Sequence, residues 1–209
     1  MLVREWMTHD PQSVNPKTTV MEAMQRMREG NFRRLPVVQA SRIVGIVTDR
    51  DLKEATPSKS TTLSVYELNY LLSKLTVQDV MQRAVVTVGP EDPFERAAVL
   101  MEEHRVSGLP VVEGGALVGM LTITDLLRAF VRFLGLREGG VRVTVDLPDE
   151  PGVLARVAQA GPPSNITAAV TAGVVENERR RMVLRVVGTE ADGFADRVRA
   201  LGITVRDVR

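Results

Sequence analysis

The residues best suited to chemistry are two threonine–aspartate pairs, each placed after a Gly-apolar-apolar run. Thr48 and Asp51 form the first pair, Thr122 and Asp125 the second, and equivalent residues are 74 positions apart. A hydroxyl at a strand end, followed three residues later by a carboxylate at a helix start, can hold a ribose phosphate. The hydroxyl and the helix-start amides suit phosphate, whereas an acceptor-only carboxylate suits sugar hydroxyls. The pattern predicts two related nucleotide sites, with Asp51 facing ribose.

The same pattern is typical of a helix N-cap followed by an acid in the first turn. A single Thr-x-x-Asp is a cap more often than it is a binding site. Its repetition after matched apolar runs favours ligand binding. The two roles are compatible within one residue, so Thr48 and Thr122 are expected to cap helices as well.

The two copies differ in the charges available to phosphate. Three arginines of the first copy align with uncharged residues of the second: Arg33, Arg34 and Arg50 align with Ser107, Gly108 and Thr124. The second copy offers His104 and Arg105 instead. Because arginine pairs bidentately with phosphoryl oxygens, we expect unequal sites, the first better suited to several phosphates. The alternative is that these arginines are solvated surface charges.

Each copy contains the elements needed to position its pair. A short β-branched run precedes a helix start, marked by Thr19 with Glu22 or by Asp92 with Pro93 and Glu95, and both signatures predict capping boxes. Two strands follow, at 35–38 and 43–47 in the first copy, and then a second helix near Asp51 or Asp125. Two such modules are expected to bury their faces against each other in one two-lobed body.

At this level of detail the repeat resembles a known family. The strand Leu35-Pro36-Val37-Val38, the Gly-Ile-Val-Thr-x-x-Asp turn and the tandem arrangement are similar to a pair of cystathionine-β-synthase (CBS) domains over residues 1–134. The resemblance implies that Thr48, Asp51, Thr122 and Asp125 contact the phosphate and ribose of adenosine nucleotides, with adenine in the cleft between the repeats. AMP, ADP or ATP would then be a regulatory ligand, and no cofactor is required.

The segment between the copies, residues 57–75, is expected to be a linker with a helix. It is turn-rich from Pro57 to Thr62, and leucines then recur at helical spacing. Its stretch from Tyr66 to Leu75 resembles acetoin-utilisation AcuB-type proteins, which carry a CBS pair followed by a small regulatory domain.

A separate domain is expected after the glycine-containing linker at 135–140. Residues 141–209 show the order βαββαβ, with the first helix opened by Pro151-Gly152 and a second helix containing Phe194 and Val198. This order resembles an ACT domain, a ferredoxin-like module that commonly binds amino acids at a dimer interface. The resemblance implies effector contacts from four residues: Asp149, Gly152, Val153 and Asn165. Glycine suits a close ligand approach because it has no Cβ.

The ACT pattern is altered where Gly161-Pro162-Pro163-Ser164 replaces the final turn of the first helix. An equally weighted alternative is therefore that this domain only dimerises, since ferredoxin-like folds host many functions.

Composition restricts the functional class. The chain has 209 residues, no cysteine, no apolar run long enough for a bilayer and no signal-peptide start, so we expect a cytoplasmic protein without a membrane role. Its 27 basic and 26 acidic residues are interspersed, which argues against nucleic acid, and the densest run, Arg179–Arg181, is expected at a hairpin tip. With two histidines and no zinc or nucleophile signature, neither a metal site nor catalysis is predicted.

The sequence therefore predicts an α/β (α+β) chain with CBS repeats at 1–56 and 76–134 and an ACT-like domain at 141–209. Its expected function is non-catalytic sensing of adenosine nucleotides, and of an amino acid at the ACT domain, by a homodimer or higher homo-oligomer acting on an unidentified regulated protein. The alternatives are an enzyme or accessory factor in acetoin breakdown, a transcriptional regulator, and a structural dimerisation scaffold.

Overall fold

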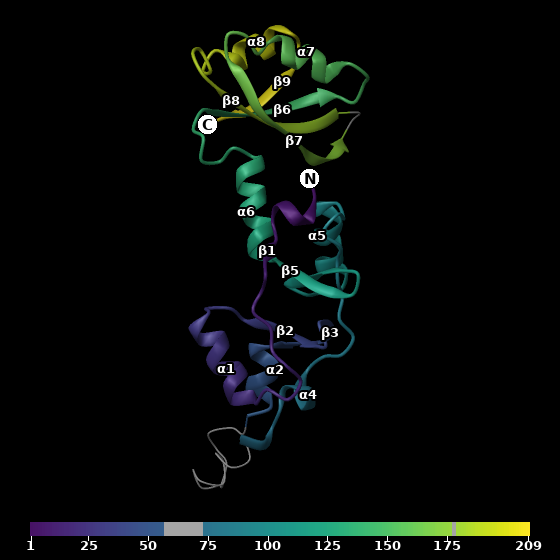
Figure 1. Cartoon of the computed structure of the whole chain (residues 1–209). Helices are drawn as coiled ribbons and strands as arrows, with labels where there is room; N and C mark the ends of the chain where they lie inside the picture. The colour runs from purple at the N-terminus through teal and green to yellow at the C-terminus, as the bar shows by residue number, and fades with distance from the viewer. Residues whose placement is uncertain (57–72, 177–178) are drawn as a thin grey trace. The chain divides into compact units, whose positions relative to one another are not determined.

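The computed structural model of this chain describes residues 1–56, 73–176 and 179–209 (Figure 1). These residues form two compact units, Met1–Leu126 and Leu127–Arg209. Most of the expected linker helix, residues 57–72, lies outside the described residues. Within the described part, no helix has the length and apolar character required to cross a bilayer.

The first unit contains the two predicted copies of strand, helix, strand, strand and helix. The elements of the first copy are α1 (Val20–Glu29), β2 (Arg34–Gln39), β3 (Arg42–Thr48) and α2 (Asp49–Glu54). Those of the second are α5 (Phe94–Glu103), β4 (Gly108–Glu113), β5 (Ala116–Thr122) and α6 (Ile123–Phe133), of which the first four residues belong to this unit. Each copy has an antiparallel hairpin, and a residue before the first helix forms a parallel bridge with it. The bridge joins Val14 to Val37 in the first copy and Val88 to Val111 in the second. The predicted order of helix, strand, strand and helix is confirmed in both copies, and the predicted first strand is reduced to this bridge.

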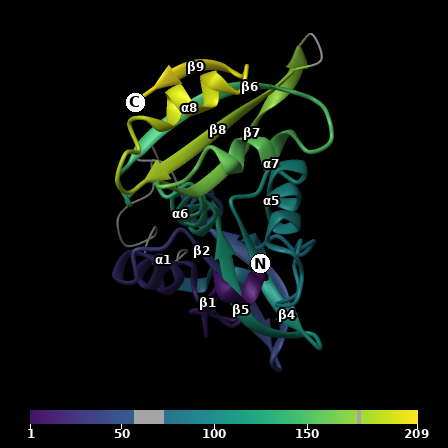
Figure 2. The ribbon, with the colours of Figure 1, turned by 90° about the horizontal axis from the view of Figure 1, so that it is seen from above.

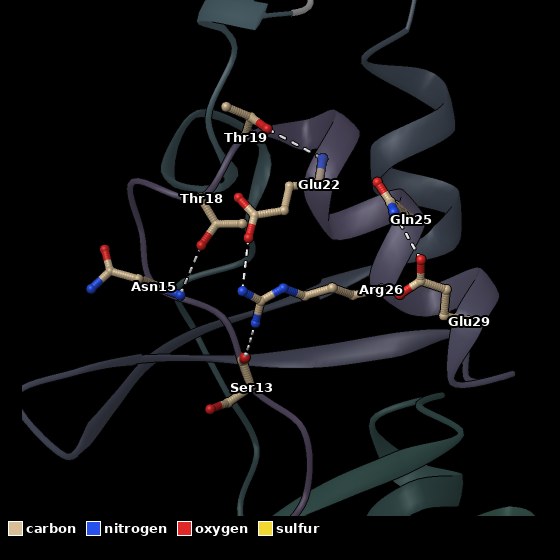
Figure 3. A network of polar contacts seen from close by, with 8 residues as sticks. All are labelled: Ser13, Asn15, Thr18, Thr19, Glu22, Gln25, Arg26 and Glu29. Atoms are coloured by element: carbon tan, nitrogen blue, oxygen red, sulfur yellow. Dashed lines mark hydrogen bonds and ion pairs between the residues drawn. The ribbon is translucent and has the colours of Figure 1, made fainter.

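Helix α1 begins as the sequence predicts, but with half of a capping box. Thr19 Oγ1 accepts a hydrogen bond from the Glu22 amide at 3.2 Å. The Glu22 carboxylate pairs instead with Arg26 at 2.7 Å, and Arg26 also donates to the Ser13 carbonyl (Figure 3). Arginine one turn along the helix therefore attracts the carboxylate away from the cap, and ties the helix to the segment that carries Val14.

The capping box predicted for α5 is wrong. The helix begins at Phe94 with Pro93 as its N-cap residue, and no side chain caps it. Asp92 Oδ2 accepts a hydrogen bond from the Gly89 amide at 2.7 Å, and Asp92 Oδ1 accepts one from Arg96. The acid thus closes the turn before the helix, because Pro93 moves the helix start one residue further along.

The two copies exchange their leading segments. The first segment contains η1 (Val3–Glu5) and β1 (Thr8–His9), and β1 pairs with β5 of the second copy. The equivalent segment contains α4 (Val77–Val80), and its Gln82 forms a bridge with Ile46 of the first copy. Val77 is fully buried in the first copy's core. Neither copy is complete without the segment that precedes the other.

The exchange explains one glycine and one methionine of each repeat. Met81 lies over Gly45, and a Cβ placed on that glycine would overlap its sulfur. Met7 lies over Gly119 in the same way. Glycine at these strand positions therefore admits the exchanged methionine in its present place, and a Cβ would force the methionine to shift.

A local twofold axis relates the two hairpins. Arg42 of β3 pairs with Ala116 of β5, and these two residues are 74 positions apart. A residue that meets its own equivalent lies near a twofold axis. The two hairpins therefore approach each other symmetrically.

The second unit is a four-stranded antiparallel sheet with two helices on one face, as Figures 1 and 2 show. Its elements are β6 (Val141–Pro148), α7 (Val153–Gln159), β7 (Asn165–Glu176), β8 (Arg179–Val187), α8 (Phe194–Ala200) and β9 (Thr204–Val208). The strand order is β7-β8-β6-β9. Alternate residues of β6 and β8 face the helices and form the core with Phe194 and Val198. The predicted ferredoxin-like βαββαβ order is confirmed.

The short first helix of this unit is closed by an arginine from the second. Arg197 Nε of α8 donates to the Ala160 carbonyl at 2.8 Å, and its Nη2 donates to Ser164 Oγ at 2.9 Å. Ser164 is buried and donates in turn to the Thr189 carbonyl at 3.2 Å. The guanidinium thus supplies donors that a longer helix would have provided through its own amides.

Candidate functional site

Both threonine–aspartate pairs lie where a hairpin strand passes into a helix. In the first, Asp51 Oδ2 accepts from the Thr48 amide at 2.8 Å and from Thr48 Oγ1 at 2.6 Å. In the second, Asp125 Oδ2 accepts from the Thr122 amide at 2.9 Å and from Thr122 Oγ1 at 2.6 Å. The pairs have nearly identical geometry. The carboxylates fix the start of α2 and of α6.

This geometry by itself indicates only helix capping, because a third Thr-x-x-Asp in the unit, outside the two repeated turns, has the same hydrogen bonds at a helix start. Asp79 at the start of α4 accepts from the Thr76 amide at 2.9 Å and from Thr76 Oγ1 at 2.6 Å. The bonds from Thr76 lower the pKa of this exposed carboxyl. A nucleotide site therefore needs features beyond the cap. It needs an unused acceptor and a nearby cation.

The first pair leaves one carboxylate oxygen lightly engaged. Asp51 Oδ1 has a 3.3 Å contact from the Gln82 side-chain amide, which comes from the exchanged segment. The residue is half-buried, whereas Asp125 is only 5% exposed. The residue equivalent to Gln82 in the other exchanged segment is Thr8. The two aspartates therefore differ in their exposure and in the residue that the exchanged segment places beside them. The arginines near the two turns differ as well.

Arg34 is the one predicted phosphate ligand that joins the two copies. Its guanidinium donates to both the carbonyl and the hydroxyl of Ser107 in the second copy. Burial lowers the pKa of Arg34, and the neighbouring charge of Arg33 lowers it further. Among the described residues, no carboxylate forms an ion pair with it. Arg34 is a partly desolvated cation with neutral partners.

The other predicted phosphate ligands are exposed and less constrained. Arg33 immediately precedes β2, while His104 and Arg105 follow the end of α5, close in sequence to Ser107. Arg50 lies on the outer side of α2, where its 85% exposed side chain pairs with Glu54 at 2.7 Å. The structure thus brings Arg33 and Arg34 to the strand end that carries Thr48, and directs Arg50 toward Glu54.

In the second unit, the predicted effector loop is held by arginines. Asp149 accepts two hydrogen bonds from Arg180 of β8, both at 2.9 Å, and this pairing lowers the pKa of the Asp149 carboxyl. Gly152, at φ +85°, is the residue before α7, and open space surrounds the position of a Cβ. Val153 is partly buried in the core below it. Only glycine adopts this backbone conformation without strain.

Asn165 lies far from that loop within one chain. It pairs with Val187 at one end of the sheet, whereas Pro148, the residue before Asp149, pairs with Arg179 at the other end. Eight strand residues span about 25 Å. The four predicted effector residues are therefore not brought together within a single chain.

The arginine run at 179–181 forms specific pairs instead of a loose charged tip. Beyond Arg180, Arg181 donates to Asp146 at 2.9 Å, and Arg179 donates to Thr204 Oγ1. Asp146 lies on β6 with a 7% exposed side chain, and Arg206 of β9 is its second cation. Hydrogen bonds from Arg181 outweigh burial and lower the pKa of Asp146. The run sits beside the hairpin tip, but its charges stabilise the sheet.

Two residues of the candidate nucleotide site, Gln82 and Ser107, did not emerge from the sequence as contacts. Both occupy positions in the 74-residue alignment, but the alignment gives no sign that leading segments are exchanged or that Arg34 crosses between copies. Within the described residues, no group of three or more His, Cys, Asp or Glu side chains could hold a metal ion.

Comparison with known protein families gives two matches that together span most of the chain. The CBS domain model matches residues 3–58 and 77–132. The TTHA0829-like ACT domain model matches residues 139–209. The first of these covers more than half of the 209 residues.

Solved structures resemble the first unit. An acetoin utilization protein (AcuB) from Vibrio cholerae is 29% identical, with a TM-score of 0.56 over 66% of this chain and 96% of that one. CBSX2 in complex with AMP is 32% identical, with a TM-score of 0.52 over 63% of this chain and 96% of that one. The CBS domain pair of MJ0100, in complex with 5′-methylthioadenosine and S-adenosyl-L-methionine, is 27% identical, with a TM-score of 0.52 over 62% and 95%.

Proposed function

The chain belongs to the CBS-domain family and ends in an ACT-like domain, and from this premise we propose that it is a regulatory sensor of adenosine nucleotides. CBS-domain proteins are in general regulatory modules, and two of the neighbours above, CBSX2 and MJ0100, are in complex with AMP and with S-adenosyl-L-methionine, respectively. The matched domains account for nearly all of this chain. The sensor acts on another protein.

The observation that carries the proposal is the combination at the first strand-to-helix turn. Asp51 Oδ1 retains acceptor capacity for a ribose hydroxyl, because its only hydrogen bond with a described residue is the 3.3 Å contact from Gln82. Thr48 supplies a hydroxyl beside the first amides of α2. Arg34 supplies a cation without an acid partner in the described part of the chain. Partners for ribose and phosphate are thus provided by the turn itself, and the compensating charge comes from Arg34 on the adjacent strand β2.

In this proposal the second turn, at Thr122 and Asp125, forms an unequal second site. Arg33, Arg50 and Arg105 contribute longer-range positive charge, which solvent screens because all three are exposed, and the exposed His104 is a further hydrogen-bonding partner. Adenine lies between the repeats. AMP, ADP and ATP are the candidate ligands, and S-adenosyl-L-methionine is an alternative with the same nucleoside.

For the ACT-like domain we propose an effector site that two copies of the chain complete. Gly152 and Val153 of one copy and Asn165 of another would meet there, since these residues lie far apart within a single chain. An amino acid is the proposed ligand class. A homodimer is the corresponding assembly, and light scattering on the purified protein measures it directly.

A thermal-shift screen tests the function as a whole. The full chain is heated with AMP, ADP, ATP, S-adenosyl-L-methionine or single amino acids, because a ligand that binds the native state raises the midpoint. We expect at least one adenosine compound to raise it. If none does, a dimerisation scaffold becomes the better account.

The AcuB neighbour supports a more specific role in regulating acetoin utilisation. The expected partner is then an enzyme of acetoin breakdown, whose activity would respond to nucleotide through this chain. Turnover of acetoin by the purified chain alone would instead favour the enzymatic alternative.

A further inference from the structure

Arg34 lies near the local twofold axis that relates the two hairpins. Its equivalent in the second copy is Gly108, and a Cβ placed on Gly108 would overlap Nη1 of Arg34. The two positions therefore face each other across the axis, as Arg42 and Ala116 do. The second copy has no side chain at this place. The axis carries one guanidinium where symmetry would allow two.

From this position Arg34 connects the two strand-to-helix turns. It pairs in register with Thr48 on β3, and Gly108 pairs in register with Thr122 on β5. Its guanidinium bonds to Ser107, whose carbonyl also accepts the amide of Ile123 at 3.2 Å. That amide is the first of α6. The backbone of Arg34 thus lies beside the first turn, and its guanidinium contacts Ser107, the residue that supports the second turn.

The charge of Arg34 is available to an anion. Its partners among the described residues are a neutral carbonyl and a neutral hydroxyl. Hydrogen bonds from a guanidinium to a phosphate are stronger than those to a neutral carbonyl or hydroxyl, and they are frequently bidentate. A phosphate near either turn would therefore replace Ser107 as the partner of Arg34.

On the basis of the proposed nucleotide binding, we propose that Arg34 is a specificity-determining residue shared by the two turns, so that each chain binds one phosphate-bearing nucleotide. One guanidinium pairs with one phosphoryl group at a time. A second phosphate close to the same axis would meet a like charge without a second cation to compensate it. The other turn then accepts a nucleoside without phosphate, such as adenosine or 5′-methylthioadenosine.

Calorimetric titrations of the full-length chain with AMP and with adenosine test this inference. We expect one AMP and two adenosine molecules per chain. Replacing Arg34 with alanine should weaken AMP binding by about ten- to a hundredfold, the loss of a charged hydrogen-bond partner, and leave adenosine binding unchanged. Arg28→Ala is the matched control, because that exposed arginine of α1 lies outside the proposed site and should leave AMP affinity unchanged.

A paired exchange tests the position on the axis. Arg34→Gly combined with Gly108→Arg moves the guanidinium across the axis, and should restore AMP binding with a stoichiometry of one. Arg34→Lys keeps the charge without the bidentate fork and should retain part of the AMP preference. These variants keep the test informative if Arg34→Ala folds poorly.

The outcomes separate this inference from the function on which it rests. Two AMP molecules per chain with equal affinity, or unchanged AMP binding in the folded Arg34→Ala protein, would overturn the shared role and leave nucleotide sensing intact. Absence of binding by both AMP and adenosine to the unaltered chain would overturn nucleotide sensing itself, and the shared role with it.

Discussion

At the scale of single residues, the same threonine–aspartate arrangement serves at three helix starts. The geometry at Thr76 and Asp79 matches that at the two repeated turns to within 0.1 Å in both hydrogen bonds that the carboxylate accepts from the threonine. A cap is thus the common role, and in the proposed function ligand binding is added only where strand ends and Arg34 are also present. Asp79 is for this reason a natural control for the other two.

Gly45 of β3, which lies under the exchanged Met81, gives a prediction about packing. Gly45→Ala should lower the free energy of unfolding by about 1–3 kcal/mol, because its Cβ would meet the Met81 sulfur in a packed site. Chemical denaturation measures the change. Met81→Ala in the same chain should recover part of the loss, so that the two substitutions are not additive. Strict additivity would contradict the contact.

Asp146 gives a prediction about pH. Its pairing with Arg181 and Arg206 lowers its pKa in the folded state below that of the unfolded chain. The stabilisation is therefore fully present above the ordinary aspartate pKa of about 3.9, and is lost as the pH falls below it through the lowered folded value. Thermal unfolding of Asp146→Asn should show a weaker acid dependence below about pH 4 than the unaltered protein. An identical acid dependence in both proteins would contradict this assignment.

At the scale of elements, the sequence predicts most of the fold because periodicity and turn chemistry act locally. The two copies of strand, helix, strand, strand and helix follow from the alignment, and βαββαβ follows from alternation along the strand at 141–147. The start of α5 differs, because Pro93 shifts the helix by one residue and leaves Asp92 to the preceding turn. Whether a capping box forms depends on which nearby donor the carboxylate bonds to. At α1 the Glu22 carboxylate bonds to Arg26 and not to the N-cap residue.

The exchange of leading segments is what the sequence cannot predict. Each segment would satisfy the same local pattern whether it packed against its own copy or the other. The choice depends on long-range contacts such as Met7 over Gly119 and Val77 in the first copy's core. Gln82 follows from these contacts and Ser107 from the reach of Arg34 between the copies, so these two residues are the parts of the candidate site that sequence reasoning misses.

The closing of α7 by Arg197 gives an element-scale prediction. Arg197→Ala should destabilise the second unit by about 1–3 kcal/mol, since buried Ser164 and the Ala160 carbonyl would lose their shared donor. Arg199→Ala is the control, because Arg199 lies on the same helix with a 51% exposed side chain and, among the described residues, pairs locally with Asp196 alone. Denaturant unfolding followed by circular dichroism measures both. Equal effects would show that Arg197 has no special role.

At the scale of the whole molecule, the chain divides into a CBS unit and an ACT-like unit with separate cores. The exchange of segments makes the two CBS copies interdependent, so they should unfold together. Differential scanning calorimetry is expected to show the CBS unit as one transition. AMP should raise that transition and leave the ACT-like transition in place. Two separate transitions for the two copies would contradict the interdependence.

The central claim is that the repeated turns bind adenosine nucleotide through their aspartates, in addition to capping helices. The most direct measurement is calorimetric titration of AMP into chains carrying Asp51→Asn with Asp125→Asn, or Asp79→Asn alone. All three substitutions weaken a cap of the same geometry. We expect the double variant to lose AMP binding and Asp79→Asn to bind AMP as the unaltered chain does. Unchanged AMP affinity in the folded double variant would contradict the claim.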